Sequence, residues 1–180
     1  MNKKISVLFL VFFLISSHSA IAQDSGRYLV FDIGQSSSNM ARGHSEFDVY
    51  RMGVQKEFKR TFWQGDSAQL SGYWEGSFNY WNADGGNEYA LALSPVFVLS
   101  FGEGEYRPFV EAGVGLAIMS DDVIGGRRMG SSWQFEDRIG FGVKSDRVGF
   151  HYRYMHYSNG DIEKPNQGID AHVIGMTYHF

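Results

Sequence analysis

Hydrophobic and polar positions alternate with a period of two along almost the whole chain after residue 26, in segments of about a dozen residues. Gly, Asn, Asp and Ser separate these segments. A period of two is that of a β-strand whose faces meet different surroundings, and no convincing stretch has the 3.6-residue period of a helix. The pattern predicts eight strands, near residues 27–36, 46–58, 69–81, 88–101, 106–119, 132–144, 147–158 and 168–180.

The later predicted strands each have one apolar face and one face of small or charged residues. In the segment 106–119 the apolar face carries Pro108, Val110, Ala112, Val114, Leu116 and Ile118. Its opposite face carries Glu111, Gly113, Gly115 and Ala117. In the segment 132–144, Asp137 interrupts the apolar row, and the pattern gives no reason for it. The alternation by itself is compatible with a soluble sandwich and with a membrane barrel.

The last predicted strand favours the membrane barrel. It ends in Tyr178-His179-Phe180, and Phe180 is in phase with Tyr178, Met176 and Ile174. A terminal aromatic on such a strand is typical of bacterial outer-membrane barrels, in which lipid-facing and lumen-facing residues alternate. Closure of eight strands would pair every strand edge inside lipid. The sequence therefore predicts an all-β fold, an eight-stranded antiparallel transmembrane β-barrel. A soluble periplasmic sandwich with a lipocalin-like pocket remains the alternative.

The N-terminus has the three parts of a secretory signal peptide: two lysines, an apolar run and an Ala-Ile-Ala cleavage site. We expect residues 1–22 to be this signal peptide and residues 23–180 to form one outer-membrane barrel domain. The signal carries two positive charges and no negative one, so its removal changes the net charge from -4 to -6, which does not suggest nucleic-acid binding. The chain has no cysteine, and beyond the signal no apolar run approaches the ~20 residues of a spanning helix.

An even number of strands places both ends of the barrel domain on the periplasmic side. The connections then expected outside the cell are 37–45, 82–87, 120–131 and 159–167. The connections expected in the periplasm are 59–68, 102–105 and 145–146. Two of these periplasmic turns are short, as is usual, whereas 59–68 is long.

Polar side chains gather on the predicted outer face where the last two strands approach the outer leaflet. The alternation that points Phe150 toward lipid also points His156 and Ser158 there. In the last strand it points Asp170 and His172 the same way. Residues i and i+2 of a strand lie about 6.5 to 7 Å apart, and cross-strand neighbours about 4.5 to 5.5 Å. These separations allow Ser158 to act as a nucleophile, His156 as a general base and Asp170 as an orienting acid. The alternative is a girdle of interfacial residues without a catalytic role, which we favour for His172.

These residues belong to a longer motif, H-x-S-N followed by P-N-x-G-I and an acid. The motif consists of His156, Ser158, Asn159, Pro165, Asn166, Gly168, Ile169 and Asp170. It resembles the signature of the lipid A 3-O-deacylases of Gram-negative outer membranes, which hydrolyse carboxylic ester bonds. The resemblance implies a barrel whose external face removes the 3-hydroxyacyl chain from the 3-position of lipid A. That family usually carries Glu where this chain has Asp170, so the acid is one methylene shorter.

Further side chains are candidates for parts of such a site. Donors for a developing oxyanion could come from Asn159, Gly160 and Asn166, although Asn-Gly and Pro-Asn pairs also favour turns. An apolar groove for the acyl chain could be formed by Tyr152, Tyr154, Ile174 and Met176. Basic loop residues that could meet lipid A phosphates, or carry ordinary solvated charge, are Arg42, Arg127, Arg128 and Lys164.

The expected partners are lipid A, as part of lipopolysaccharide, and the lipids of the outer membrane. This mechanism needs no metal and no cofactor, and the oligomeric state stays open. The competing function is a noncatalytic surface barrel, an adhesin or a structural porin-like protein. Such a barrel would bind partners through its loops 37–45 and 120–131.

Overall fold

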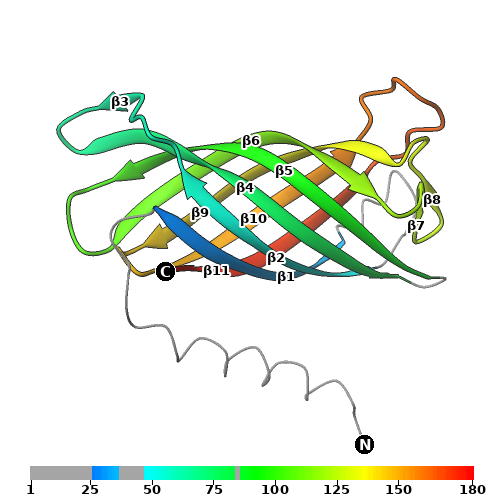
Figure 1. Cartoon of the computed structure of the whole chain (residues 1–180), viewed down its shortest axis with the longest axis horizontal. Coiled ribbons are helices and arrows are strands. Elements are labelled where there is room, and N and C mark those ends of the chain that lie inside the picture. The colour runs from blue at the N-terminus through cyan, green and yellow to red at the C-terminus, as the bar shows by residue number, and fades with distance from the viewer. Residues whose placement is uncertain (1–25, 37–46, 84–85) are drawn as a thin grey trace, which may run out of the picture.

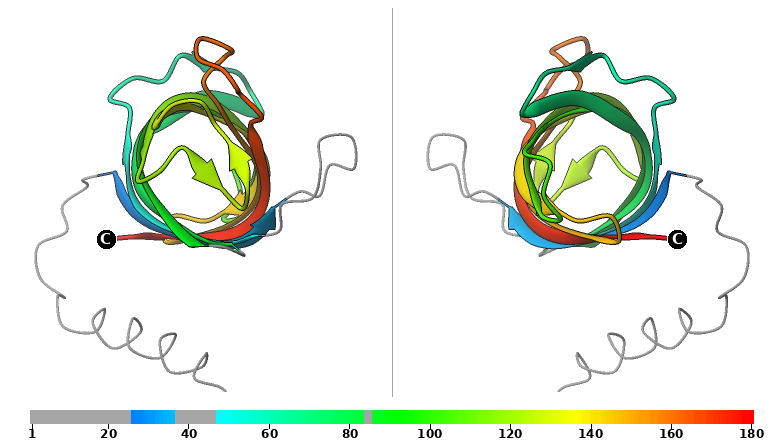
Figure 2. Two further views of the ribbon diagram at one scale, coloured as in Figure 1. Left: turned by 90° about the vertical axis from the view of Figure 1, so that its right-hand side faces the viewer. Right: turned by 90° about the vertical axis from the view of Figure 1, so that its left-hand side faces the viewer.

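Eight long strands close into a barrel in the computed structural model, which describes residues 26–36, 47–83 and 86–180 (Figure 1). These strands are β1 (Arg27–Ser36), β2 (Phe47–Glu57), β4 (Ala68–Ala83), β5 (Gly86–Phe101), β6 (Arg107–Met119), β9 (Trp133–Lys144), β10 (Val148–Ser158) and β11 (Ile169–His179). They pair antiparallel in the order β2-β1-β11-β10-β9-β6-β5-β4, and β4 pairs with β2 to complete the ring that Figure 2 shows end-on. The predicted eight-stranded antiparallel barrel is confirmed.

The predicted strands agree with the observed ones within a few residues, but the connections contain more structure than expected. Three further strands have two residues each: β3 (Trp63–Gln64), β7 (Val123–Ile124) and β8 (Arg127–Arg128). β3 pairs with β4 inside the long connection 59–68, and β7 pairs with β8 inside the connection 120–131. Most of the predicted loop 82–87 is strand. The predicted signal peptide and the predicted loop 37–45 lie outside the described residues.

Large apolar side chains cover the outside of the barrel. On β6, Val110, Val114, Leu116 and Ile118 are exposed, whereas Glu111 is buried in the lumen. This is the reverse of a soluble sandwich and excludes that alternative. Aromatic rings contact one another in two groups on the outside: Tyr50, Tyr80 and Tyr89 toward one end, and Phe58, Phe62, Trp74 and Phe97 toward the other. In the described part of the chain, no helix is long and apolar enough to cross a membrane.

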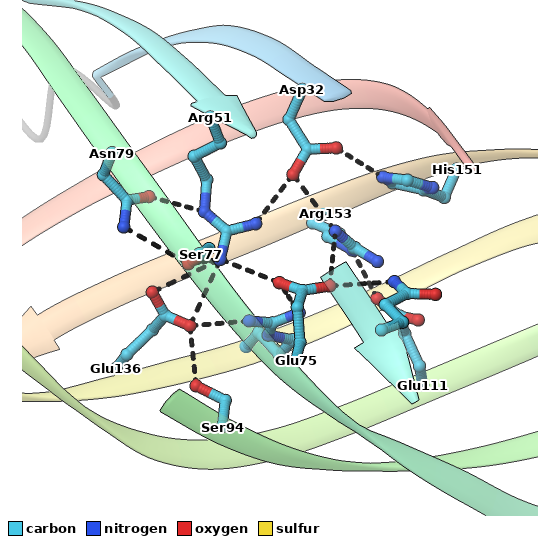
Figure 3. A network of polar contacts seen from close by, with 12 residues as sticks. Asp32, Arg51, Glu75, Ser77, Asn79, Ser94, Glu111, Glu136, His151 and Arg153 are labelled. Carbon is cyan, nitrogen blue, oxygen red and sulfur yellow. Dashed lines mark hydrogen bonds and ion pairs between the residues drawn. The ribbon is translucent and has the colours of Figure 1, made fainter. Parts of the chain in front are cut away.

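Charged side chains fill the middle of the lumen. They are Asp32, Arg51, Glu75, Glu111, Glu136, Arg138, His151 and Arg153. The guanidinium of Arg51 lies 2.7 Å from Asp32 and 2.9 Å from Glu75. That of Arg138 lies 2.8 Å from Glu75 and 2.6 Å from Glu136. Figure 3 shows much of this network around Glu75. Every carboxylate in it has a guanidinium partner, which offsets the cost of burying the charges.

Apolar side chains close the lumen at the end that carries the β7–β8 hairpin. Ile124 and Met129 from this segment are fully buried and belong to one cluster with Trp81, Met155 and Tyr157. Figure 2 shows the hairpin lying across the mouth of the barrel. The sequence pattern indicated small or charged inner faces, and it missed this apolar plug. The hairpin sits at the same end as the connection 159–167, which brings both loops next to the candidate site (Figure 1).

Candidate active site

Antiparallel pairing of β10 and β11 brings His156 opposite Asp170. The neighbours Met155 and Tyr157 are fully buried inside the barrel. Because side chains alternate between the two faces of a strand, His156 lies on the outer face. Ser158, the last residue of β10, lies on that same face. The strand register thus gathers a histidine, an acid and a serine on the outside of the barrel, close to its external end.

The imidazole of His156 is hydrogen-bonded to the carboxylate of Asp170. Its Nδ1 lies 2.6 Å from Oδ1 of the acid. The His156 side chain is 27% exposed and that of Asp170 is 9% exposed, so the pair is partly shielded but reachable from outside. Since Nδ1 is engaged, Nε2 is the nitrogen that can exchange a proton with a third group. This arrangement matches the base and orienting acid of a hydrolytic triad.

Ser158 shares a cavity of about 560 Å³ with His156. The cavity is lined by Arg127, His156, Ser158, Gly160, Asp161, Asn166, Gln167 and Gly168. Among the described contacts no hydrogen bond joins the Ser158 hydroxyl to the imidazole. The two side chains face the same space from positions i and i+2 of one strand, and such bonds often form only when substrate is bound. The structure therefore brings nucleophile and base candidates together without yet coupling them.

The predicted oxyanion donors lie around the turn that follows β10. Gly160 and Asn166 line the cavity. The side chain of Asn159 is buried instead, where its amide donates to the carbonyl oxygens of Met129 at 3.0 Å and Glu163 at 2.8 Å. The main-chain N–H of Asn159 donates to Oδ1 of Asn166 at 3.4 Å. Asn159 thus holds the loop in place, while an oxyanion role for any of the three stays a prediction.

An apolar groove of about 710 Å³ runs over the outer face of β1, β9, β10 and β11. Its large apolar and aromatic side chains are Phe31, Ile33, Phe141, Val143, Phe150, Tyr152, Ile174 and Met176, and the lining also includes His151. Three of the four predicted groove residues are therefore part of it, and Tyr154 is not. The Tyr152–Ile174 pair lies four residue pairs along the strands from His156–Asp170, which makes it the second pair along on the outer face. The groove therefore begins below the polar site on the lipid side.

Tyr154 and His172 lie between the polar site and the groove. The Tyr154 hydroxyl donates to Oδ1 of Asp170 at 2.7 Å. The ring of His172 lies 5.3 Å from that of Tyr154, and its Nδ1 lies 2.5 Å from the hydroxyl of Tyr152. His172 therefore packs within a group of aromatic rings, as expected of an interfacial residue, whereas Tyr154 contacts the candidate acid directly.

Asp137 is a neighbour of the site that the sequence did not assign. It lies on β9 directly across from His156, on the side opposite to Asp170. The imidazole is thus flanked by carboxylates on both adjacent strands. A charged residue on a lipid-facing row is costly in the membrane. The break that Asp137 makes in the apolar face of this strand is therefore the sequence signal that could have drawn attention to it.

The short β8 strand docks onto the connection 159–167. The guanidinium of Arg127 donates to the carbonyl oxygens of Gln167 at 2.6 Å and Gly168 at 2.7 Å. The main-chain N–H of Arg128 donates to the side chain of Gln167 at 2.6 Å. Arg128 and Lys164 are exposed, and Arg42 lies outside the described residues. Of the predicted basic residues that the structure describes, Arg127 lines the cavity and the other two do not.

A closed barrel with a histidine–carboxylate pair and a serine on its lipid-side surface defines a class, that of membrane-embedded hydrolases acting on lipids. The comparison with protein families identifies which one. The family model for lipid A 3-O-deacylase (PagL) matches residues 48–179, so the chain belongs to this family. This protein is therefore an outer-membrane enzyme that acts on ester bonds. That conclusion excludes the competing function of a noncatalytic surface barrel.

Individual relatives agree with this assignment. The lipid A deacylase PagL of Pseudomonas aeruginosa is 36% identical over 129 residues, covering 70% of this chain and 75% of that protein. The lipid A deacylase PagL of Bordetella bronchiseptica is 36% identical over 134 residues, covering 67% and 71%. The crystal structure of the outer membrane enzyme PagL superimposes with a TM-score of 0.77 at 31% identity, covering 85% of this chain and 99% of the other. Neisserial surface protein A shares the fold alone, with a TM-score of 0.53 at 14% identity, over 87% of this chain and 98% of the other.

Proposed function

We propose that this enzyme hydrolyses the ester bond of the 3-hydroxyacyl chain at the 3-position of lipid A, with Ser158 as nucleophile, His156 as general base and Asp170 as orienting acid. The observation that carries the proposal is the 2.6 Å bond between His156 and Asp170 on the outer face, in a cavity shared with Ser158. Lipid A lies in the outer leaflet, with its sugars at the water boundary and its acyl chains in the hydrocarbon. Its ester bonds are therefore at the depth of this site.

The reaction begins with the hydroxyl of Ser158. Its oxygen attacks the ester carbonyl carbon while its proton passes to Nε2 of His156. Asp170 holds Nδ1–H of the ring and stabilises the imidazolium that forms. The imidazolium then returns the proton to the departing sugar oxygen, which leaves an acyl group on Ser158. A water molecule, deprotonated by the same ring, releases the fatty acid and restores the serine.

Two further regions complete this proposal. Asn166 and Gly160 line the cavity. We assign the side-chain amide of Asn166 and the main-chain N–H of Gly160 as donors to the oxyanion. The apolar groove that contains Tyr152, Ile174 and Met176 would hold the acyl chain, because it begins on the lipid side of the ester position. The polar end and the apolar end of the substrate would thus meet matching surfaces along β10 and β11.

The nucleophile is tested with Ser158→Ala in the folded barrel, reconstituted in lipid with lipopolysaccharide as substrate. Mass spectrometry of lipid A reports the loss of one hydroxyacyl chain. We expect the rate of that loss to fall by at least about a thousandfold, because the covalent route is removed. The matched control is Ser132→Ala, an exposed serine that does not line the cavity, which should keep full activity.

The two variants must both migrate as folded, heat-modifiable barrels for the comparison to hold. Wild-type deacylation by Ser158→Ala would remove this serine from the mechanism, although the family assignment would stand. A mass loss that differs from one hydroxyacyl chain would instead overturn the proposed bond specificity.

A further inference from the structure

We propose that Tyr154 is a positioning residue for the deacylation, which fixes the carboxylate of Asp170 in the orientation that His156 needs. The inference rests on the proposed function, because it assigns Tyr154 to the acid of that triad. It differs from the sequence-based assignment of Tyr154 to the acyl groove.

The contacts of one oxygen atom support the inference. Oδ1 of Asp170 accepts the Nδ1–H of His156 at 2.6 Å and the hydroxyl of Tyr154 at 2.7 Å. Both donors come from the same outward row of β10, two residues apart. A hydrogen bond to a charged acceptor is stronger than one between neutral groups. The tyrosine therefore provides a second strong bond that acts directly on the proposed acid.

A short acid benefits from such a bond. The terminal torsion of an aspartate has a broad energy minimum, so the carboxylate plane is poorly fixed by the side chain itself. The Tyr154 hydroxyl fixes it by holding the oxygen that faces His156. The deacylase signature that this chain resembles has Glu at this position, whereas this chain carries the shorter Asp170. The hydroxyl of Tyr154 lies within hydrogen-bond distance of that shorter side chain.

The ring of Tyr154 is itself held in place. It lies 5.3 Å from the ring of His172, which in turn is bonded to the hydroxyl of Tyr152. A tyrosine side chain has only two torsions, so one ring contact and one hydrogen bond largely determine its position. The hydroxyl can therefore be removed without removing the packing of the ring.

Tyr154→Phe tests the inference, because it deletes the hydroxyl and keeps the ring. Steady-state deacylation by the folded barrel in lipid should show kcat lower by about ten- to a hundredfold, the effect of one hydrogen bond to a charged group, with KM within about twofold. The matched control is Tyr80→Phe on β4. This outward tyrosine packs against Tyr50 and Tyr89 away from the site, and its substitution should leave kcat and KM unchanged.

The second arm repeats the substitution in a chain that also carries Asp170→Glu. The longer acid places its carboxylate one methylene farther from the strand, beyond the geometry in which Tyr154 bonds Asp170. We therefore expect Tyr154→Phe to cost less than about threefold in kcat in this background. Such non-additivity measures direct coupling between the two side chains.

The outcomes separate the alternatives. A raised KM with unchanged kcat in Tyr154→Phe would return this residue to the acyl groove and overturn the inference. Equal losses of kcat in the wild-type background and in the Asp170→Glu background would also overturn it, because the hydroxyl would then act independently of the acid. A fully active Ser158→Ala would overturn the proposed triad itself, whatever Tyr154→Phe does.

Discussion

At the scale of single residues, His156 lies between two acids that differ in their relation to the ring. Asp170 on β11 is bonded to Nδ1 at 2.6 Å. Asp137 on β9 is the register partner on the other side, and the described contacts include no hydrogen bond between it and the imidazole. We therefore propose that Asp170 orients the ring, whereas Asp137 acts on it through its charge. A nearby carboxylate stabilises an imidazolium without touching it, and more so where little water screens the interaction.

Isosteric substitution separates these two roles. Asp137→Asn removes the charge and keeps the shape, and we expect kcat to fall by about three- to tenfold, because only a through-space attraction is lost. Asp170→Asn should cost at least about a hundredfold, since the ring then loses its orienting acceptor. The rate of acyl release from lipopolysaccharide, measured for both variants at one pH, gives the two losses of kcat. An equal loss in the two variants would mean that Asp137 shares the orienting role.

At the scale of elements, the period of two in the sequence predicted the long strands within a few residues and placed His156, Ser158 and Asp170 on the outer face. The two-residue strands β7 and β8 escaped prediction, because so short a segment has no period to detect. The docking of β8 on the connection 159–167 also escaped it. Side chains that meet across thirty to forty residues of sequence leave no local pattern. The contacts of Arg127 and of the buried amide of Asn159 therefore could not be predicted, although both residues were candidates for other roles.

Arg127→Gln tests whether β8 holds the connection 159–167 in its working position. The glutamine is shorter and cannot bond both carbonyl groups, so we expect faster hydrogen exchange in residues 159–168 and kcat/KM lower by about tenfold. Hydrogen exchange followed by mass spectrometry measures the change in exchange rate of residues 159–168, and the deacylation assay measures kcat/KM. Arg128→Gln is the matched control for exchange, because Arg128 contacts Gln167 through its main chain. Unchanged exchange in Arg127→Gln would show that the main-chain contacts suffice.

At the scale of the whole molecule, the barrel separates two kinds of polar group. The lumen buries a network in which carboxylates pair with guanidinium groups. The outer face carries the polar residues of the site among apolar side chains. In the later strands the sequence predicted inward charges from their phase. It did not predict which charges pair, because a period gives the face of a residue and not its partner across the lumen. A rigid, filled interior fits a surface site, because it fixes the spacing of β9, β10 and β11.

Arg138→Met tests how far that network stabilises the barrel. The methionine fills most of the volume but leaves Glu75 and Glu136 without the contacts of 2.8 and 2.6 Å that Arg138 makes. Loss of one partner from a buried ion pair costs about 3–5 kcal/mol, because the remaining charges stay in a poorly solvating interior. Urea unfolding in lipid vesicles, monitored by the heat-modifiable migration of the folded barrel, should show this decrease in the free energy of unfolding. The same substitution at the exposed Arg147 should change the free energy of unfolding by less than about 0.5 kcal/mol. If the two variants unfold alike, the contacts that Arg51 and Arg153 make with the buried carboxylates suffice, and Arg138 is not needed to stabilise the lumen.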